Sequence, residues 1–80
     1  MEVLSVGGDA ERTRLANRIR VARAELGLSQ EQLALMAGVT RQTISYIETG
    51  QYAPSTRLAL LLARALGRTV DEIFYLEESE

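Results

Sequence analysis

The residue types best suited to specific chemistry in this chain stand next to each other at Arg41 and Gln42. Arginine can form two hydrogen bonds to guanine O6 and N7, and glutamine can do the same to adenine N6 and N7. Ile44 and Ile47 follow at a spacing that turns both inward from one helix, so Arg41 and Gln42 should face outward. The pattern favours a pair of side chains that contact DNA bases. The alternative is an ordinary solvated first turn.

Ser45 and Tyr46 should lie on the outward side of the same helix. Both are candidates for base contacts, but Tyr46 could equally pack against a neighbour or touch a phosphate. Thr43 is a candidate for a phosphate contact. Gln30 is another, because the N-terminus of the preceding helix offers free N–H groups and the positive end of its dipole to an anion. The alternative for Gln30 is a role in local capping alone.

Residues 30–49 are typical of two short helices joined by a tight turn, which would position these side chains. Ser29 and Gln32 form a capping-box pattern before the first helix. Gly38 stands where the chain must reverse, since glycine accepts positive φ there. Thr40 can cap the second helix. A helix-turn-helix of twenty residues requires a small residue, a turn glycine and two inward aliphatic residues at fixed positions. Ala34, Gly38, Ile44 and Ile47 stand at those positions, which indicates a DNA-binding unit.

The rest of the chain adds three short helices. An apolar face made by Leu15, Ile19, Ala22 and Leu26 predicts a first helix that begins between residues 10 and 13 and ends at Leu26. A fourth helix should follow the loop at residues 51–54, and a short fifth helix should follow Thr69. We therefore expect an all-α fold, a compact bundle of five helices with the helix-turn-helix pair second and third.

The domain boundaries follow from composition. Residues 1–12 should form a flexible lead-in, residues 13–76 the helix-turn-helix domain, and residues 77–80 an acidic tail.

Further candidates for phosphate contacts stand in or after the loop between the third and fourth helices: Tyr52, Ser55 and Arg57. Each of these three could equally be an ordinary surface residue.

The composition excludes several classes of protein. Eighty residues make one small domain. The chain has no histidine and no cysteine, so it lacks the usual general base and the commonest metal ligands; an enzyme, a metal or another cofactor, and a small-molecule substrate are not expected. The absence of cysteine suits a reducing cytoplasm. No segment approaches the roughly 20 apolar residues that span a membrane.

The charge is unevenly distributed. The net charge of −2 argues at first against nucleic acid. However, all nine arginines lie between Arg12 and Arg68 with only three glutamates, which leaves that segment at +6. The acidic residues gather at the two ends of the chain. A locally basic surface is what phosphate contact requires, whatever the pI of the whole chain.

Several motifs occur together: Leu26-Gly27-Leu28-Ser29-Gln30, Gly38-Val39, Arg41-Gln42-Thr43-Ile44-Ser45, Ile47-Glu48 with Gly50, and Pro54-Ser55. With them, residues 17–78 resemble the Xre family of phage-repressor and Cro-like helix-turn-helix proteins, especially the small standalone regulators. The resemblance implies a third helix in the major groove of double-stranded DNA and a homodimer on a two-fold operator. It also implies an ion pair between Arg23 and Glu48 that is structural rather than functional.

Alternatives remain at this point. An antitoxin or a restriction-modification controller uses the same fold, and an adjacent toxin or endonuclease gene would identify either. A protein-interaction module without DNA binding would place acidic or bulky apolar residues on the exposed side of the third helix. The interface of a homodimer should lie in the last helix and tail, at Val70, Ile73, Phe74, Tyr75 and Leu76. In the other reading, Ile73 and Phe74 simply cover the core.

Overall fold

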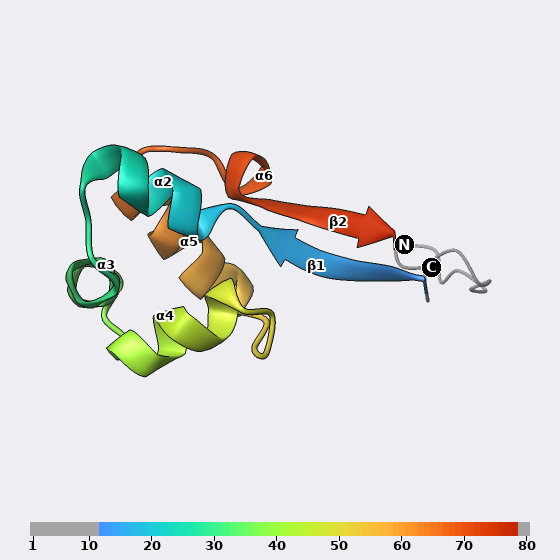
Figure 1. The fold of residues 1–80 in the computed structure, drawn as a ribbon, viewed down its shortest axis with the longest axis horizontal. Helices are drawn as coiled ribbons and strands as arrows, with labels where there is room; N and C mark the ends of the chain where they lie inside the picture. Colours follow the sequence, from blue (N-terminus) through green and yellow to red (C-terminus); the bar gives the residue numbers. More distant parts are fainter. Residues whose placement is uncertain (1–11, 79–80) are drawn as a thin grey trace.

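A computed structural model describes residues 12–78, in which five α-helices enclose a core and a two-stranded ribbon projects to one side (Figure 1). The elements are, in order, β1 (Thr13–Asn17), α2 (Ile19–Leu26), α3 (Gln30–Ala37), α4 (Arg41–Glu48), α5 (Thr56–Leu66), α6 (Val70–Ile73) and β2 (Phe74–Glu78). None of the helices in this part of the chain has the length and apolarity needed to cross a bilayer. The expected flexible lead-in lies outside the described residues, apart from Arg12.

Local hydrogen bonds fix the ends of the helix-turn-helix pair as the sequence predicted. The hydroxyl of Ser29 accepts a bond from the backbone N–H of Gln32 at 3.0 Å, and the side-chain oxygen of Gln32 accepts one from the backbone N–H of Ser29 at 2.8 Å. Gly38 ends α3 with a φ of 76°, in the left-handed region. The hydroxyl of Thr40 caps α4. The two caps set where α3 and α4 start, and Gly38 sets where α3 ends.

The core fixes the orientation of α4. Its largest fully buried side chains come from all five helices: Ile19, Leu33, Ile44, Ile47, Leu62 and Ile73. Ile44 and Ile47 are thus the inward residues of α4, as their spacing predicted. Because buried side chains interdigitate at near-crystalline density, α4 cannot rotate without opening a void. The opposite side of α4 is therefore held outward.

The expectation of an all-α fold is wrong in one respect, because Thr13–Asn17 forms a strand and the first helix begins only at Ile19. β1 pairs with β2 in antiparallel register, with Thr13 opposite Glu78. The change to helix follows at once: the side-chain oxygen of Asn17 accepts from the N–H of Ile19 at 3.1 Å, and Arg18 N–H donates to the carbonyl of Ile73 at 2.8 Å. The backbone N–H groups of Arg18 and Ile19 are therefore already bonded and are not available to extend the helix toward the N-terminus.

Two residues of the expected acidic tail, Glu77 and Glu78, belong to β2 (Phe74–Glu78), and the other two lie outside the described residues. Side chains on one face of the ribbon support the pairing. Arg14 meets Glu77 across the strands at 3.4 Å, and the guanidinium of Arg18 lies 4.1 Å from the ring centre of Tyr75. Arg14 and Arg18 therefore both have partners on β2.

Candidate nucleic-acid interface

α4 presents polar side chains on the side opposite its two core residues. Ile44 and Ile47 are buried, whereas Arg41, Gln42 and Tyr46 are exposed. A guanidinium, a carboxamide and a phenol therefore face solvent together along one helix. These groups offer the donors and acceptors that base edges in the major groove match.

Gln42 and Tyr46 are joined on this surface. The side-chain amide of Gln42 donates a hydrogen bond of 2.8 Å to the hydroxyl of Tyr46, one turn further along α4. The bond uses one of the two amide hydrogens. Gln42 thus keeps its carbonyl oxygen and a second N–H for a partner, and the hydroxyl of Tyr46 keeps its own hydrogen. The two residues form one hydrogen-bonded unit.

Thr43 and Ser45 sit closer to the body of the helix, and both are half-buried. The hydroxyl of Thr43 lies 2.9 Å from that of Thr40, and its backbone N–H donates to the same oxygen at 3.2 Å. The carbonyl of Ser45 accepts from the hydroxyl of Thr49 at 3.0 Å. Any contact that Thr43 makes with a ligand must therefore be compatible with its place in the cap of α4.

Arg23 of α2 and Glu48 of α4 form the ion pair that the sequence resemblance implied. The two N–H···O contacts measure 2.7 and 3.2 Å, and the side chains are only 14% and 2% exposed. Arg23 also donates to the carbonyl of Leu28 at 2.9 Å. A buried carboxylate with this many partners fixes the end of α4 against α2.

The ion pair continues to the exposed surface through Gln30. The side-chain amide of Gln30 donates to Glu48 at 3.0 Å, and its carbonyl oxygen accepts from the guanidinium of Arg41 at 3.3 Å. Arg41, a candidate for a base contact, is thus linked by hydrogen bonds to the ion pair between the helices. Sequence spacing did not indicate this connection, because Gln30 and Glu48 are eighteen positions apart.

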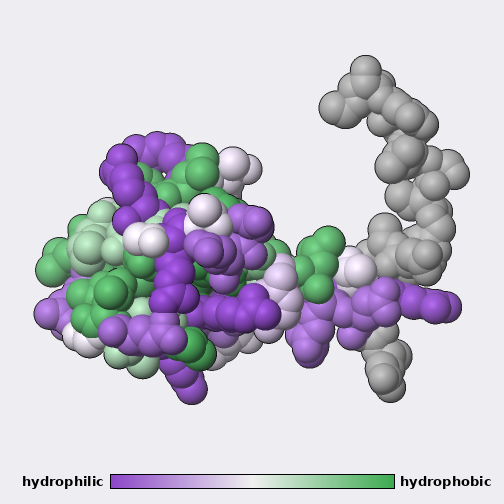
Figure 2. Space-filling view, turned by 90° about the horizontal axis from the view of Figure 1, so that it is seen from above, coloured by the Kyte–Doolittle hydropathy of each residue, from purple (hydrophilic) through white to green (hydrophobic). Residues whose placement is uncertain are grey.

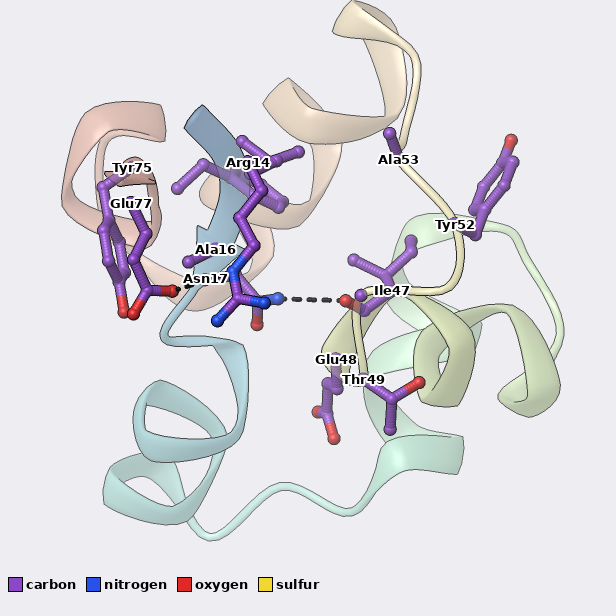
Figure 3. A pocket seen from close by; sticks show the side chains of 13 residues that line it. Arg14, Ala16, Asn17, Ile47, Glu48, Thr49, Tyr52, Ala53, Tyr75 and Glu77 are labelled. Carbon is purple, nitrogen blue, oxygen red and sulfur yellow. Dashed lines mark hydrogen bonds and ion pairs between the residues drawn. The ribbon is translucent and has the colours of Figure 1, made fainter. Parts of the chain in front are cut away.

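Asn17 is a structural residue that the sequence analysis did not single out. Its side-chain N–H donates to the carbonyl of Ile47 at 2.9 Å, while its oxygen holds the start of α2 (Figure 3). Asn17 therefore joins the root of the ribbon to the C-terminal end of α4. A short polar residue shortly before an apolar helical pattern is a candidate for capping the helix. This pattern is the sequence signal by which Asn17 could have been found.

The loop after α4 and the first turn of α5 carry the other candidate contact residues. Tyr52, Ser55 and Arg57 are all exposed. The hydroxyl of Ser55 accepts from the N–H of Leu58 at 3.1 Å and so caps α5. Its own hydrogen is still available to an acceptor such as a phosphate oxygen.

A hollow of about 560 Å³ separates the ribbon from the C-terminal end of α4 (Figure 3). Arg14, Tyr75 and Glu77 line it on the ribbon side, and Thr49 and Tyr52 line it on the other side. Within residues 12–78, no cluster of three or more histidine, cysteine, aspartate or glutamate side chains could hold a metal ion. The polar lining of the hollow includes Asn17, Glu48 and Thr49 as well as the ion pair between Arg14 and Glu77.

The helices and these side chains define the class of the protein. A family model described as "Helix-turn-helix" matches residues 19–73, which cover α2 through α6. The chain belongs to this family, and is a small DNA-binding transcriptional regulator of the Xre and Cro-like type. The resemblance seen in the sequence is thereby confirmed.

Curated relatives carry the same description. An "Uncharacterized HTH-type transcriptional regulator" of Methanothermobacter thermautotrophicus is 57% identical over 61 residues, which are 75% of this chain and 88% of that protein. The regulator YgzD of Bacillus subtilis is 44% identical over 64 residues, which are 80% of this chain and 97% of YgzD. The chain thus spans nearly the whole length of both relatives.

Solved structures agree with the fold. The P22 c2 repressor in complex with a synthetic operator is 35% identical with a TM-score of 0.66. The restriction-modification controller protein C.AhdI of Aeromonas hydrophila is 39% identical with a TM-score of 0.65. Each match covers 68% of this chain and 82% of the other.

Proposed function

We propose that this regulator acts as a homodimer that binds a two-fold operator, with α4 in the major groove. The observation that carries the proposal is the exposed set Arg41, Gln42 and Tyr46 on a helix whose rotation is fixed by Ile44 and Ile47. Residues near the N-terminus of a recognition helix reach the base edges in this docking geometry. The operator-bound P22 c2 repressor, a structural relative, supports this arrangement.

The individual roles follow from side-chain chemistry. Arg41 would bind guanine and Gln42 adenine, with Ser45 and Tyr46 as the next base contacts along the helix. The phosphate contacts would come from Thr43 in the first turn of α4 and from residues before and after that helix: Gln30, Tyr52, Ser55 and Arg57. Such contacts fix the register of the helix on DNA but carry no base information.

A second candidate function is control of a restriction-modification operon. The likeness to the controller protein C.AhdI supports this candidate. An antitoxin with the same fold is the other alternative. Both candidates use the same DNA-binding surface. The gene next to this one discriminates among them, because a controller accompanies an endonuclease and an antitoxin accompanies a toxin.

Selection of bound sequences from a random duplex pool tests the proposed function. The expected result is one enriched motif with two-fold symmetry. A variant in which Arg41 and Gln42 are both alanine should lose that enrichment, whereas Arg20→Ala, an exposed arginine on α2, should keep it. Absence of any enriched motif with the unaltered protein would overturn the proposal. An enriched motif without symmetry would overturn the homodimer on DNA.

A further inference from the structure

The two faces of the ribbon differ in character. Arg14 and Glu77 pair on one face, where Arg18 also covers the ring of Tyr75. On the other face Leu15 and Leu76 stand directly opposite each other in the register, yet they are 40% and 69% exposed. Figure 2 shows hydrophobic residues exposed on the projecting ribbon between hydrophilic ones. On one face, therefore, the charged and aromatic side chains pair with each other across the strands. On the other face, two leucines are uncovered.

Of the two uncovered leucines, Leu15 also lines a groove at the root of the ribbon. The groove has a volume of about 360 Å³ and is mostly apolar, lined by Leu15, Pro54, Thr56, Ala59, Leu60, Val70 and Phe74. Leu60 is 57% exposed there, although Leu58, Leu62 and Leu66 of the same helix are buried. Leu15, Leu60 and Leu76 with this groove are called the leucine face below.

A surface of this kind is unfavourable in water. A two-stranded ribbon on its own is marginally stable, and its stability requires a covered apolar face. Contiguous exposed apolar patches on small proteins mark interaction sites more often than chance. The polar face of the ribbon has its own partners, so the leucine face is where a covering molecule would bind.

We propose that the leucine face is the homodimer interface and that its occupant is the leucine face of a second copy; this rests on the homodimer of the proposed function and assigns its surface. The charges around the face support this occupant. Arg64 lies one turn beyond Leu60 on α5, and Glu78 lies two residues beyond Leu76 on the same face of the ribbon. One side of the leucine face is basic and the other is acidic.

A two-fold axis satisfies both sides together. When the axis lies in the interface, across the line that joins Arg64 to Glu78, the basic side of each copy meets the acidic side of the other. Dimerisation also leaves the candidate base-contacting side chains on α4 free, since Arg41, Gln42 and Tyr46 do not line the groove. Ile73 is fully buried, as in the alternative in which it covers the core, and Tyr75 is on the opposite ribbon face, so neither belongs to this interface.

Sedimentation of the full chain without DNA, over a range of concentrations, tests this interface. The variants are Leu60→Lys, Leu15→Lys and Leu76→Lys, with Leu35→Lys as the matched control because Leu35 is 77% exposed on α3 and outside the leucine face. The unaltered chain should be a dimer. Each leucine-face variant should raise the dimer dissociation constant by at least about tenfold, and Leu35→Lys should not change it.

Leu60→Lys decides the outcome, because it lies on α5 and leaves the ribbon sequence intact; circular dichroism checks that each variant is folded. A monomeric unaltered chain at every concentration overturns the proposal, and so does a Leu60→Lys chain that dimerises as tightly as Leu35→Lys. Binding to a duplex with a single half-site tests the proposed DNA binding independently of the proposed interface. Monomeric Leu60→Lys should still bind the half-site. If the unaltered chain were a dimer that binds no duplex, the proposed DNA binding would be contradicted but the proposed interface would not.

Discussion

The side-chain amide of Gln30 donates a hydrogen bond of 3.0 Å to the buried carboxylate of Glu48. Gln30 also accepts from Arg41 at 3.3 Å, so the first residue of α3 connects the ion pair between α2 and α4 to the exposed side of α4. A phosphate contact by Gln30 would therefore act on a side chain that also bonds to Arg41, the proposed base contact.

Gln30→Ala should have two effects on DNA binding. Loss of a phosphate contact weakens binding to every sequence by a similar factor. Loss of the bond to Arg41 should in addition broaden the preference at the base pair that Arg41 contacts. The measurement is a binding profile over all single-base variants of the operator. A uniform loss with unchanged preference would mean that Gln30 contacts phosphate but does not position Arg41.

Arg23→Ala and Glu48→Ala should each destabilise the fold by about 3–5 kcal/mol, because each leaves the other charge buried without its partner. Replacing both together should cost less than the sum of the single changes. Denaturant unfolding of the four chains measures this coupling. Additive losses would show that the contact in the structure does not contribute as a pair.

Arg41→Ala and Gln42→Ala should each weaken operator binding by about 1–3 kcal/mol and relax the preference at one symmetric pair of positions. Thermal unfolding should hardly change, since both side chains are exposed. Arg20→Ala serves as the control for loss of one positive charge. If both α4 variants lowered the affinity for every operator sequence equally, the specificity would have to come from Ser45, Tyr46 or DNA shape.

Tyr46→Phe should relax the preference at the position that Gln42 contacts, because the change removes the acceptor for the amide of Gln42 and little else. The effect should disappear when Gln42 is already alanine. Operator profiles of the two single variants and the double variant provide the test. An equal effect of Tyr46→Phe in both backgrounds would indicate that Tyr46 contacts DNA independently.

Binding to duplex DNA should depend strongly on salt despite the sequence pI of about 5.1. The logarithm of the affinity should fall against the logarithm of salt concentration with a slope of about −0.9 per phosphate contacted. Titrations of the operator at several salt concentrations give the slope. Arg57→Ala should reduce it by about one unit, and a nearly flat dependence would contradict the electrostatic argument.

The sequence by itself determined the helix-turn-helix pair. Its caps at Ser29 and Thr40, its turn at Gly38 and the inward pair Ile44 and Ile47 all rest on interactions within a few residues along the chain. A periodic pattern records such short-range interactions directly. For the same reason the side of α4 that faces outward could be predicted.

Tertiary structure alone decided the ribbon and the connections to it. Leu15 fits the apolar period of a helix, but its backbone is paired with a strand sixty-one positions away at Leu76, and no local pattern contains that partner. The bonds from Asn17 to Ile47 and from Gln30 to Glu48 likewise join residues that meet only once the helices have packed. Propensity favours the conformation that neighbours can stabilise, and long-range hydrogen bonds to the end of the chain outweighed it here.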